Sequence, residues 1–167
     1  FGYSGFILLE FLCIFFFLFI FFLIFKKINF SNLISLLLSA FIFALPSLTS
    51  LFDILNFPHL ESMHLHDFYG LRVPRPIISN LYLFTFFYLL IQFYKEKISS
   101  NFLSLCFGLF LSLMWASVYY NFSMSAIALG IVLILNYKEQ LFFNLKKNYK
   151  FILSIILYFI IFSTPFL

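Results

Sequence analysis

Residues 6–25 read FILLEFLCIFFFLFIFFLIF, a nearly unbroken apolar run that ends at Lys26 and Lys27. An α-helix needs about 20 apolar residues to cross the hydrocarbon core of a bilayer, and this run has that length. A lone apolar strand is excluded, because its backbone N–H and C=O groups would have no partners in lipid. The run therefore predicts a membrane-spanning helix, in which Glu10 is the only charged residue.

The rest of the chain has the same apolar character. Of its 167 residues, 64% are apolar, 25% are aromatic and only 10% are charged. A soluble domain carries about 25% charged residues, so we expect lipid rather than water to solvate this surface. We predict an all-α fold, a polytopic transmembrane helix bundle of about six spans. Both ends look cut, so we expect one transmembrane domain that is a fragment of a longer protein. The predicted spans are 6–25, 31–52, 79–94, 98–120, 123–137 and 151–167.

The distribution of lysines predicts the orientation of these spans. The net charge is +4, but the lysines stand in short clusters between apolar runs, which indicates topology signals and not nucleic-acid binding. With about six spans, all three lysine-bearing connections fall on one face, and the positive-inside rule makes that face cytoplasmic. The segment 53–78 is then an outer loop, which we expect on the outer side of a bacterial inner membrane. The lysines concerned are Lys26, Lys27, Lys95, Lys97, Lys138, Lys146, Lys147 and Lys150.

Small residues at four-residue steps predict where the helices pack. Such residues let helix backbones approach closely in lipid. We expect packing within the chain, with self-association as the minor alternative, and we expect Pro46 to kink the second span. A tight outer turn is predicted at residues 120–122, beside an aromatic belt that contains Trp115. The small residues are Ser31, Ser35 and Ser39 in the second span, Ser100, Ser104, Gly108, Ser112 and Ala116 in the fourth, and Ala126 and Gly130 in the fifth.

The predicted outer loop, DILNFPHLESMHLHDFYGLRVPRPII at 53–78, concentrates the reactive side chains of the chain. It holds all three histidines and both arginines. If its first half is an interfacial helix, Glu61, His64 and Asp67 share one face, which could hold a divalent cation such as Mg or Mn or supply a general base. His66 would join His64 only on one face of a strand. The alternative is an ordinary solvated interfacial helix.

The second half of the loop, Arg72-Val73-Pro74-Arg75-Pro76, cannot be helical because each proline disfavours the helical conformation in the residue before it. In an extended polyproline conformation Arg72 and Arg75 face the same way, about 9 Å apart. Two guanidinium groups on a stiff backbone suit a phosphate or diphosphate. The alternative is that both arginines reach lipid phosphates beside the third span, whose N-terminus Ser79 is expected to cap.

The stretch from Arg72-Val73-Pro74-Arg75-Pro76-Ile77-Ile78-Ser79 to Trp115-Ala116-Ser117-Val118-Tyr119-Tyr120 resembles part of the bacterial C-type superfamily of membrane glycosyltransferases. The resemblance covers roughly residues 65–135 and rests on the Arg-x-Pro-x-Pro segment followed by apolar helices. It implies a sugar transferred from a polyprenyl-phosphate carrier at the outer face, a catalytic acid in an external loop and often a divalent metal. The superfamily's acid is usually in the first external loop, which could lie before Phe1. The outer acids present here are Asp53, Glu61 and Asp67.

Three functions follow from these features. The leading hypothesis is a glycosyltransferase or polysaccharide-assembly enzyme that uses a lipid-linked sugar donor. Arg72 and Arg75 would then bind the carrier phosphate, and Asp67 or Glu61 would be the base. His64 or His66 would assist through metal binding or hydrogen bonding. The second hypothesis is a transporter or flippase, for which Glu10 and the proline-containing second span are the relevant features. The third is a non-catalytic membrane subunit whose loop binds a partner.

Overall fold

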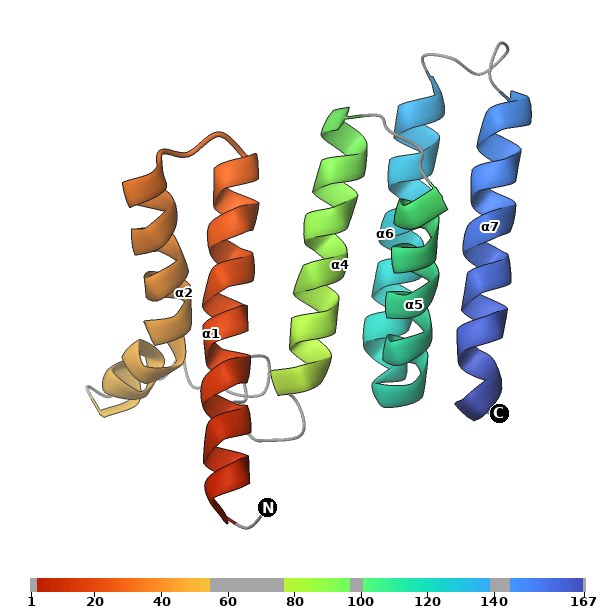
Figure 1. Ribbon diagram of the computed structural model, residues 1–167. Coiled ribbons are helices and arrows are strands. Elements are labelled where there is room, and N and C mark those ends of the chain that lie inside the picture. The colour runs from red at the N-terminus through yellow and green to blue at the C-terminus, as the bar shows by residue number, and fades with distance from the viewer. Residues whose placement is uncertain (1–2, 55–76, 97–100, 139–144, 167) are drawn as a thin grey trace. The chain divides into compact units, whose positions relative to one another are not determined.

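A computed structural model of the chain describes residues 3–54, 77–96, 101–138 and 145–166. These residues are helical almost throughout and contain no strand, which confirms the all-α prediction for the described part of the chain. Figure 1 shows the helices in chain order. They are α1 (Tyr3–Lys27), α2 (Asn32–Ile54), α4 (Ile77–Glu96), α5 (Asn101–Ser117), α6 (Tyr119–Lys138), α7 (Leu145–Ser163) and a short 3-10 turn, η1 (Thr164–Phe166).

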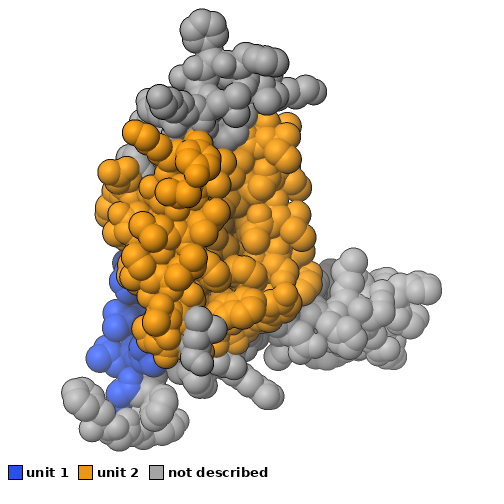
Figure 2. All heavy atoms as spheres, turned by 90° about the vertical axis from the view of Figure 1, so that its right-hand side faces the viewer, with its two compact units in different colours: residues 1–81 blue, residues 82–167 orange. Residues whose placement is uncertain are grey.

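The chain forms two compact units, Phe1–Leu81 and Tyr82–Leu167, called unit 1 and unit 2 here. The boundary falls in the early turns of α4, so that most of this helix belongs to unit 2. Figure 2 shows unit 2 in orange, seen from the side on which α7 lies in Figure 1. Because each unit has its own contacts, each is described by itself.

Unit 1 is a helical hairpin whose turn is defined by backbone hydrogen bonds. Asn29 has φ 83°, a left-handed conformation that asparagine tolerates better than most residues. The Phe30 N–H donates to the Phe25 carbonyl at 3.2 Å and the Asn29 N–H donates to the Lys26 carbonyl at 3.1 Å, the pairing of a Schellman helix end. The rings of Phe25 and Phe30 meet at 6.0 Å across this turn. Ser31 then caps α2 by accepting from the Ile34 N–H at 3.4 Å.

The interface between α1 and α2 pairs large side chains with small ones. Phe17 and Phe21 of α1 are buried, with their ring centroids 4.9 Å apart. Among residues 32–44 of α2 the buried ones are Ser35 and Ser39, two of the three serines predicted to form a packing stripe, whereas Ser31, just before the helix, is exposed. Ser39 and Ala40 of α2 line one groove with Phe19 and Phe22 of α1, so α2 presents small residues beside the large ones of α1. α2 contains Pro46, and its last turns bend away from its first turns in Figure 1.

Unit 2 has an aromatic core in which α4, α5 and α7 meet. Phe107 of α5 is completely buried and lies 5.2 Å from Phe86 and 6.1 Å from Phe93 of α4, measured between ring centroids. Phe151 of α7 stacks on Phe93 at 5.2 Å. Leu83, Phe86, Leu90 and Phe93 recur every three or four residues and are all buried, so α4 turns a single apolar stripe toward this core.

The close crossing of α5 and α7 explains the small-residue stripe of α5. Ser104, Gly108 and Ser112 are buried at four-residue steps. A Cβ atom added at Gly108 would lie 2.5 Å from the Tyr158 Cβ and 2.9 Å from the Phe159 backbone nitrogen. Nothing larger than glycine fits there without moving the α7 backbone. The predicted packing within the chain is therefore confirmed at Gly108, and its neighbours Ser104 and Ser112 are buried as a packing stripe requires.

The turn between α5 and α6 differs from the predicted turn at residues 120–122. α5 ends at Ser117 and α6 begins at Tyr119, so the helices break at Val118 alone. Asn121 lies inside α6 and is buried, although the sequence predicted it at the tip of an outer turn. Contact between Trp115 of α5 and Phe122 of α6 explains why the break lies at Val118. Their ring centroids are 5.1 Å apart across the break.

Two other helix ends also differ from the predicted spans. α7 begins at Leu145 and not at residue 151, so Lys146, Lys147 and Lys150 lie in its first turns and not in a connection. α4 begins at Ile77, which places Ser79 inside the helix and not at its cap. The earlier start of α7 follows from its lysines, which are good helix formers that a count of apolar residues does not register.

Candidate functional site

Every residue predicted to act in catalysis, phosphate binding or metal binding lies outside the described residues, because all of them fall within 55–76. They are Glu61, His64, His66, Asp67, Arg72 and Arg75. Asp53, the remaining acid of the predicted outer loop, lies in the last turn of α2. The roles given to the loop residues therefore stay predictions.

The structure does describe the two helix ends that enclose this segment. α2 ends at Ile54, and α4 begins at Ile77 directly after Pro76. The first turn of α4 holds two buried polar residues, Ser79 at 2% exposure and Asn80 at 9%. The Arg72–Pro76 segment is therefore followed directly by α4, and the first turn of α4 carries two buried polar side chains.

No metal-binding cluster occurs in the described part of the chain, in which no three His, Cys, Asp or Glu side chains come together. All three histidines lie in the segment 55–76, so this finding does not bear on the predicted Mg or Mn site. Glu10, the charged residue of the first predicted span, is exposed on α1.

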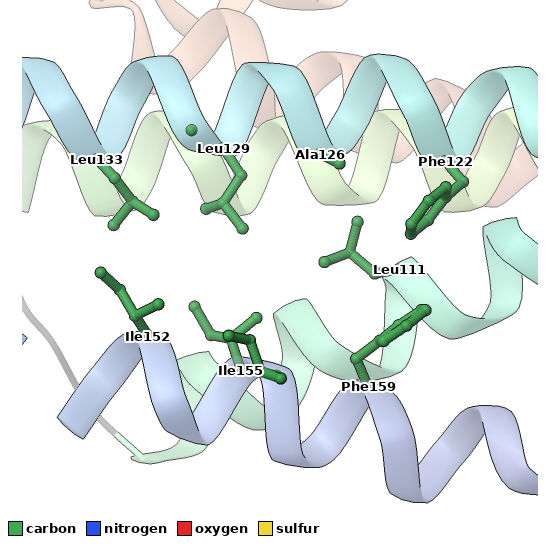
Figure 3. A pocket seen from close by; sticks show the side chains of 10 residues that line it. Leu111, Phe122, Ala126, Leu129, Leu133, Ile152, Ile155 and Phe159 are labelled. Carbon is green, nitrogen blue, oxygen red and sulfur yellow. The ribbon is translucent and has the colours of Figure 1, made fainter. Parts of the chain in front are cut away.

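Unit 2 contains an apolar cleft that the sequence did not predict. It lies between α6 and α7, has a volume of about 220 Å³, and has Leu111 of α5 as its floor (Figure 3). At one end the rings of Phe122 and Phe159 stack at 5.5 Å, and toward the other end lie Leu133 and Ile152. The cleft therefore extends along the helices over the length between Phe122 and Leu133, about 16 Å at 1.5 Å per residue.

Gly130 shows why the cleft exists and corrects one packing prediction. The sequence indicated that Ala126 and Gly130 bring α6 close to another helix, as small residues do in α5. Both residues line the cleft. Ala126 also packs against the buried core of unit 2, so the prediction fails only at Gly130, where an added Cβ atom would meet nothing within 4 Å. Gly108 and Gly130 thus stand in the same spacing of small residues but differ in their surroundings. The backbone of α7 lies against Gly108, whereas no backbone lies against Gly130.

A second apolar groove lies on unit 1. It has a volume of about 380 Å³ and runs beside the α1–α2 contact, where Phe15, Phe19 and Phe22 face Leu36 and Ala40. Polar atoms contribute little to its wall apart from Ser39, whose hydroxyl donates to the Leu36 carbonyl at 2.8 Å. The groove has therefore no group that could orient a polar ligand.

Comparison with known protein families, curated proteins and solved structures finds no match to the chain. The resemblance to C-type membrane glycosyltransferases therefore rests on the residues quoted for it, from Arg72 to Tyr120, and stays a prediction.

Proposed function

We propose that the chain is a multi-pass helical membrane protein. The observation that carries this proposal is the distribution of side chains between inside and outside. Large apolar side chains stand exposed on the helices, for example Phe11 at 66% and Ile134 at 68%, while Ser35 and Ser125 are completely buried. In water this arrangement would expose far more apolar surface than a soluble protein carries in one patch, whereas in lipid it is favourable.

Helix length supports the same proposal. Among the described residues, Ile7–Lys27 and Tyr149–Phe166 are long and apolar enough to cross a membrane. Asn101–Ser117 and Tyr119–Leu135 are shorter apolar helices, at about the 17-residue lower limit for a span. Thinning of the bilayer or snorkelling of flanking side chains accommodates helices of this length at modest cost.

The positions of the lysines within unit 2 support the predicted orientation. Lys95 lies in the last turn of α4, Lys138 ends α6, and Lys150 lies near the start of α7. Because successive helices of this unit alternate in direction, these three residues lie at the same end of it (Figure 1). A positively charged end is the cytoplasmic end by the positive-inside rule.

The orientation is tested by labelling single cysteines in intact cells with a membrane-impermeant thiol reagent. A cysteine at position 66 should react from outside and a cysteine at position 147 should react only after the membrane is permeabilised. Both variants should carry replacements of Cys13 and Cys106, which are free thiols. Labelling of position 147 but not of position 66 in intact cells would invert the topology and remove the basis for an outer active site.

For the activity we propose transfer of a sugar from a lipid-phosphate carrier at the outer face. The proposal rests on Arg72 and Arg75, whose spacing on a proline-stiffened backbone suits a phosphate. Stabilising the departing phosphate is the main electrostatic requirement of a glycosyl donor, and paired guanidinium groups meet it. Asp67 or Glu61 would accept the proton of the acceptor hydroxyl. His64 and His66, with these acids, are the residues that would hold a divalent cation.

The activity is tested by replacing both arginines with alanine in the full-length protein. R72A/R75A should abolish sugar transfer from a polyprenyl-phosphate donor, while the protein still accumulates in the membrane. The matched control is K26A/K27A, which removes two positive charges from the predicted cytoplasmic side. Six other lysines remain there to maintain the orientation, which labelling of position 66 checks, so transfer should stay intact. Full transfer by the arginine variant would contradict the phosphate-binding role.

Two other functions give different results in the same preparations. A transporter or flippase would move substrate across proteoliposomes without forming product, and variants of Glu10 would impair it. A non-catalytic subunit would tolerate alanine at all eight charged and histidine positions of the segment 53–78, and only its apolar positions would matter for partner binding.

A further inference from the structure

The cleft between α6 and α7 is an unfilled gap in the wall of unit 2. Its lining is apolar on all three helices, from Leu111 at the floor to Gly130 and Ile155 on the sides. Apolar cavities of this size stay dry and bind apolar guests, so water is not a suitable occupant. In a bilayer the remaining candidates for filling it are a hydrocarbon chain and a side chain or helix of another protein.

We propose that the cleft binds one acyl chain of an anionic phospholipid, with the headgroup at the Lys150 end. The inference rests on the proposed membrane insertion of the chain. The cleft has a volume of about 220 Å³, far less than a helix occupies, and it runs along the helix axes to the stacked rings of Phe122 and Phe159. A helix is about 10 Å across and could not enter it, whereas a single extended hydrocarbon chain could lie between α6 and α7 along the length of the cleft.

The residues next to Ile152, at the end of the cleft away from the stacked rings, account for the headgroup. Ile152 lines the cleft, and two residues earlier Lys150 is exposed at the start of α7, beside the exposed ring of Tyr149. A tyrosine and a lysine together are the side chains that occupy the boundary between hydrocarbon and headgroups. This end is also the predicted cytoplasmic end, where the anionic lipids of a membrane attract lysines. The opposite end has the aromatic residues Trp115, Tyr119 and Phe122 and no described positive charge.

The test is native mass spectrometry of the protein reconstituted in vesicles of equal parts phosphatidylglycerol and phosphatidylcholine and then extracted in mild detergent. The wild-type protein should retain one phosphatidylglycerol molecule. Gly130→Leu should lose it, because the leucine side chain occupies the cleft, and open space around Gly130 means that the helices need not move. Lys150→Gln should reduce the preference for phosphatidylglycerol over phosphatidylcholine by about fivefold, which corresponds to one lysine near an anionic surface.

The matched control is Ile131→Phe, which adds similar bulk on α6 at an exposed position outside the cleft and should retain the lipid. Co-flotation of each variant with the vesicles, measured separately, reports membrane insertion. A protein that does not float contradicts the proposed membrane insertion, and the lipid site with it. If the proteins float, two results contradict the lipid site alone. These are retention of the lipid by Gly130→Leu and an unchanged headgroup preference in Lys150→Gln. A wild-type dimer without lipid that Gly130→Leu makes monomeric would identify a second copy as the occupant and overturn the proposal.

Discussion

Unit 1 and unit 2 are built from the same apolar residues, yet they bury them differently. In unit 1 the buried apolar residues form a single row on α1, and Phe11 and Phe15 of the same helix stay exposed. In unit 2 three helices surround Phe107, which has no exposed surface. The difference shows that apolar composition alone does not produce a core. A core needs a third helix close enough to enclose the side chains, and in unit 2 the close approach of α7 to α5 at Gly108 provides it.

The largest difference in stability is expected between two variants, each of which removes one phenylalanine ring, from unit 2 in one case and from unit 1 in the other. Phe107→Ala deletes a ring in contact with Phe86, Phe93 and Phe151, so the free energy of unfolding should fall by about 3 kcal/mol. Phe11→Ala removes a ring that is 66% exposed and should change it by less than about 0.5 kcal/mol. Reversible unfolding in detergent micelles, followed by helical circular dichroism, measures both. Equal losses would mean that the two units do not differ in packing.

A smaller difference in stability is expected between alanine substitutions at the two glycines of unit 2, Gly108 and Gly130. Gly108→Ala places a methyl group against the Tyr158 side chain and the Phe159 backbone, and overpacking of this kind costs about 1–3 kcal/mol. Gly130→Ala is the matched control, because its new methyl group meets open space and alanine favours a helix over glycine. We expect lower stability for the first variant and unchanged or slightly higher stability for the second, by the same unfolding measurement. The reverse order would contradict the close α5–α7 crossing.

The smallest change in stability is expected for Ser35→Ala, at one of the two buried serines of α2. The buried hydroxyl of Ser35 has no hydrogen-bond partner among the described residues, so Ser35→Ala should change stability by less than about 0.5 kcal/mol. Ser35→Leu should instead push α2 away from α1, because the position is completely buried in the hairpin. If Ser35→Ala were as damaging as Ser35→Leu, the hydroxyl and not the small volume would be the feature that α1 requires.

For most helix ends in both units, the predicted position lies within a few residues of the observed one. Each helix is a long apolar run, and the hydrogen-bonding requirement of a backbone in an apolar environment permits only one regular structure for a single run. Charged helix ends were less predictable. α7 begins six residues before the predicted position, since Leu145 precedes 151, and its first turns contain lysines that favour a helix as strongly as leucine does.

The small-residue stripes were predictable as places of close approach, but not all of them are such places. Gly108 meets the backbone of α7 between its buried neighbours Ser104 and Ser112, while a Cβ atom added at Gly130 would meet nothing within 4 Å. The spacing in the sequence is the same, and the difference lies in which helix stands opposite. The break at Val118 could not be predicted either, because it depends on contacts that Trp115 makes across the turn with residues of the next helix.

By itself the sequence determined that the described chain is helical, and it placed all eight lysines outside the segment 53–78, which holds both arginines and all three histidines. These are local properties, since they depend on the length of apolar runs and on the order of residues. The tertiary structure alone decided that Phe107 is enclosed, that Gly108 is the contact point of α5 and α7, and that a cleft remains beside Gly130. The physical reason is that packing depends on the distance between helix backbones far apart in the chain, which no local pattern specifies.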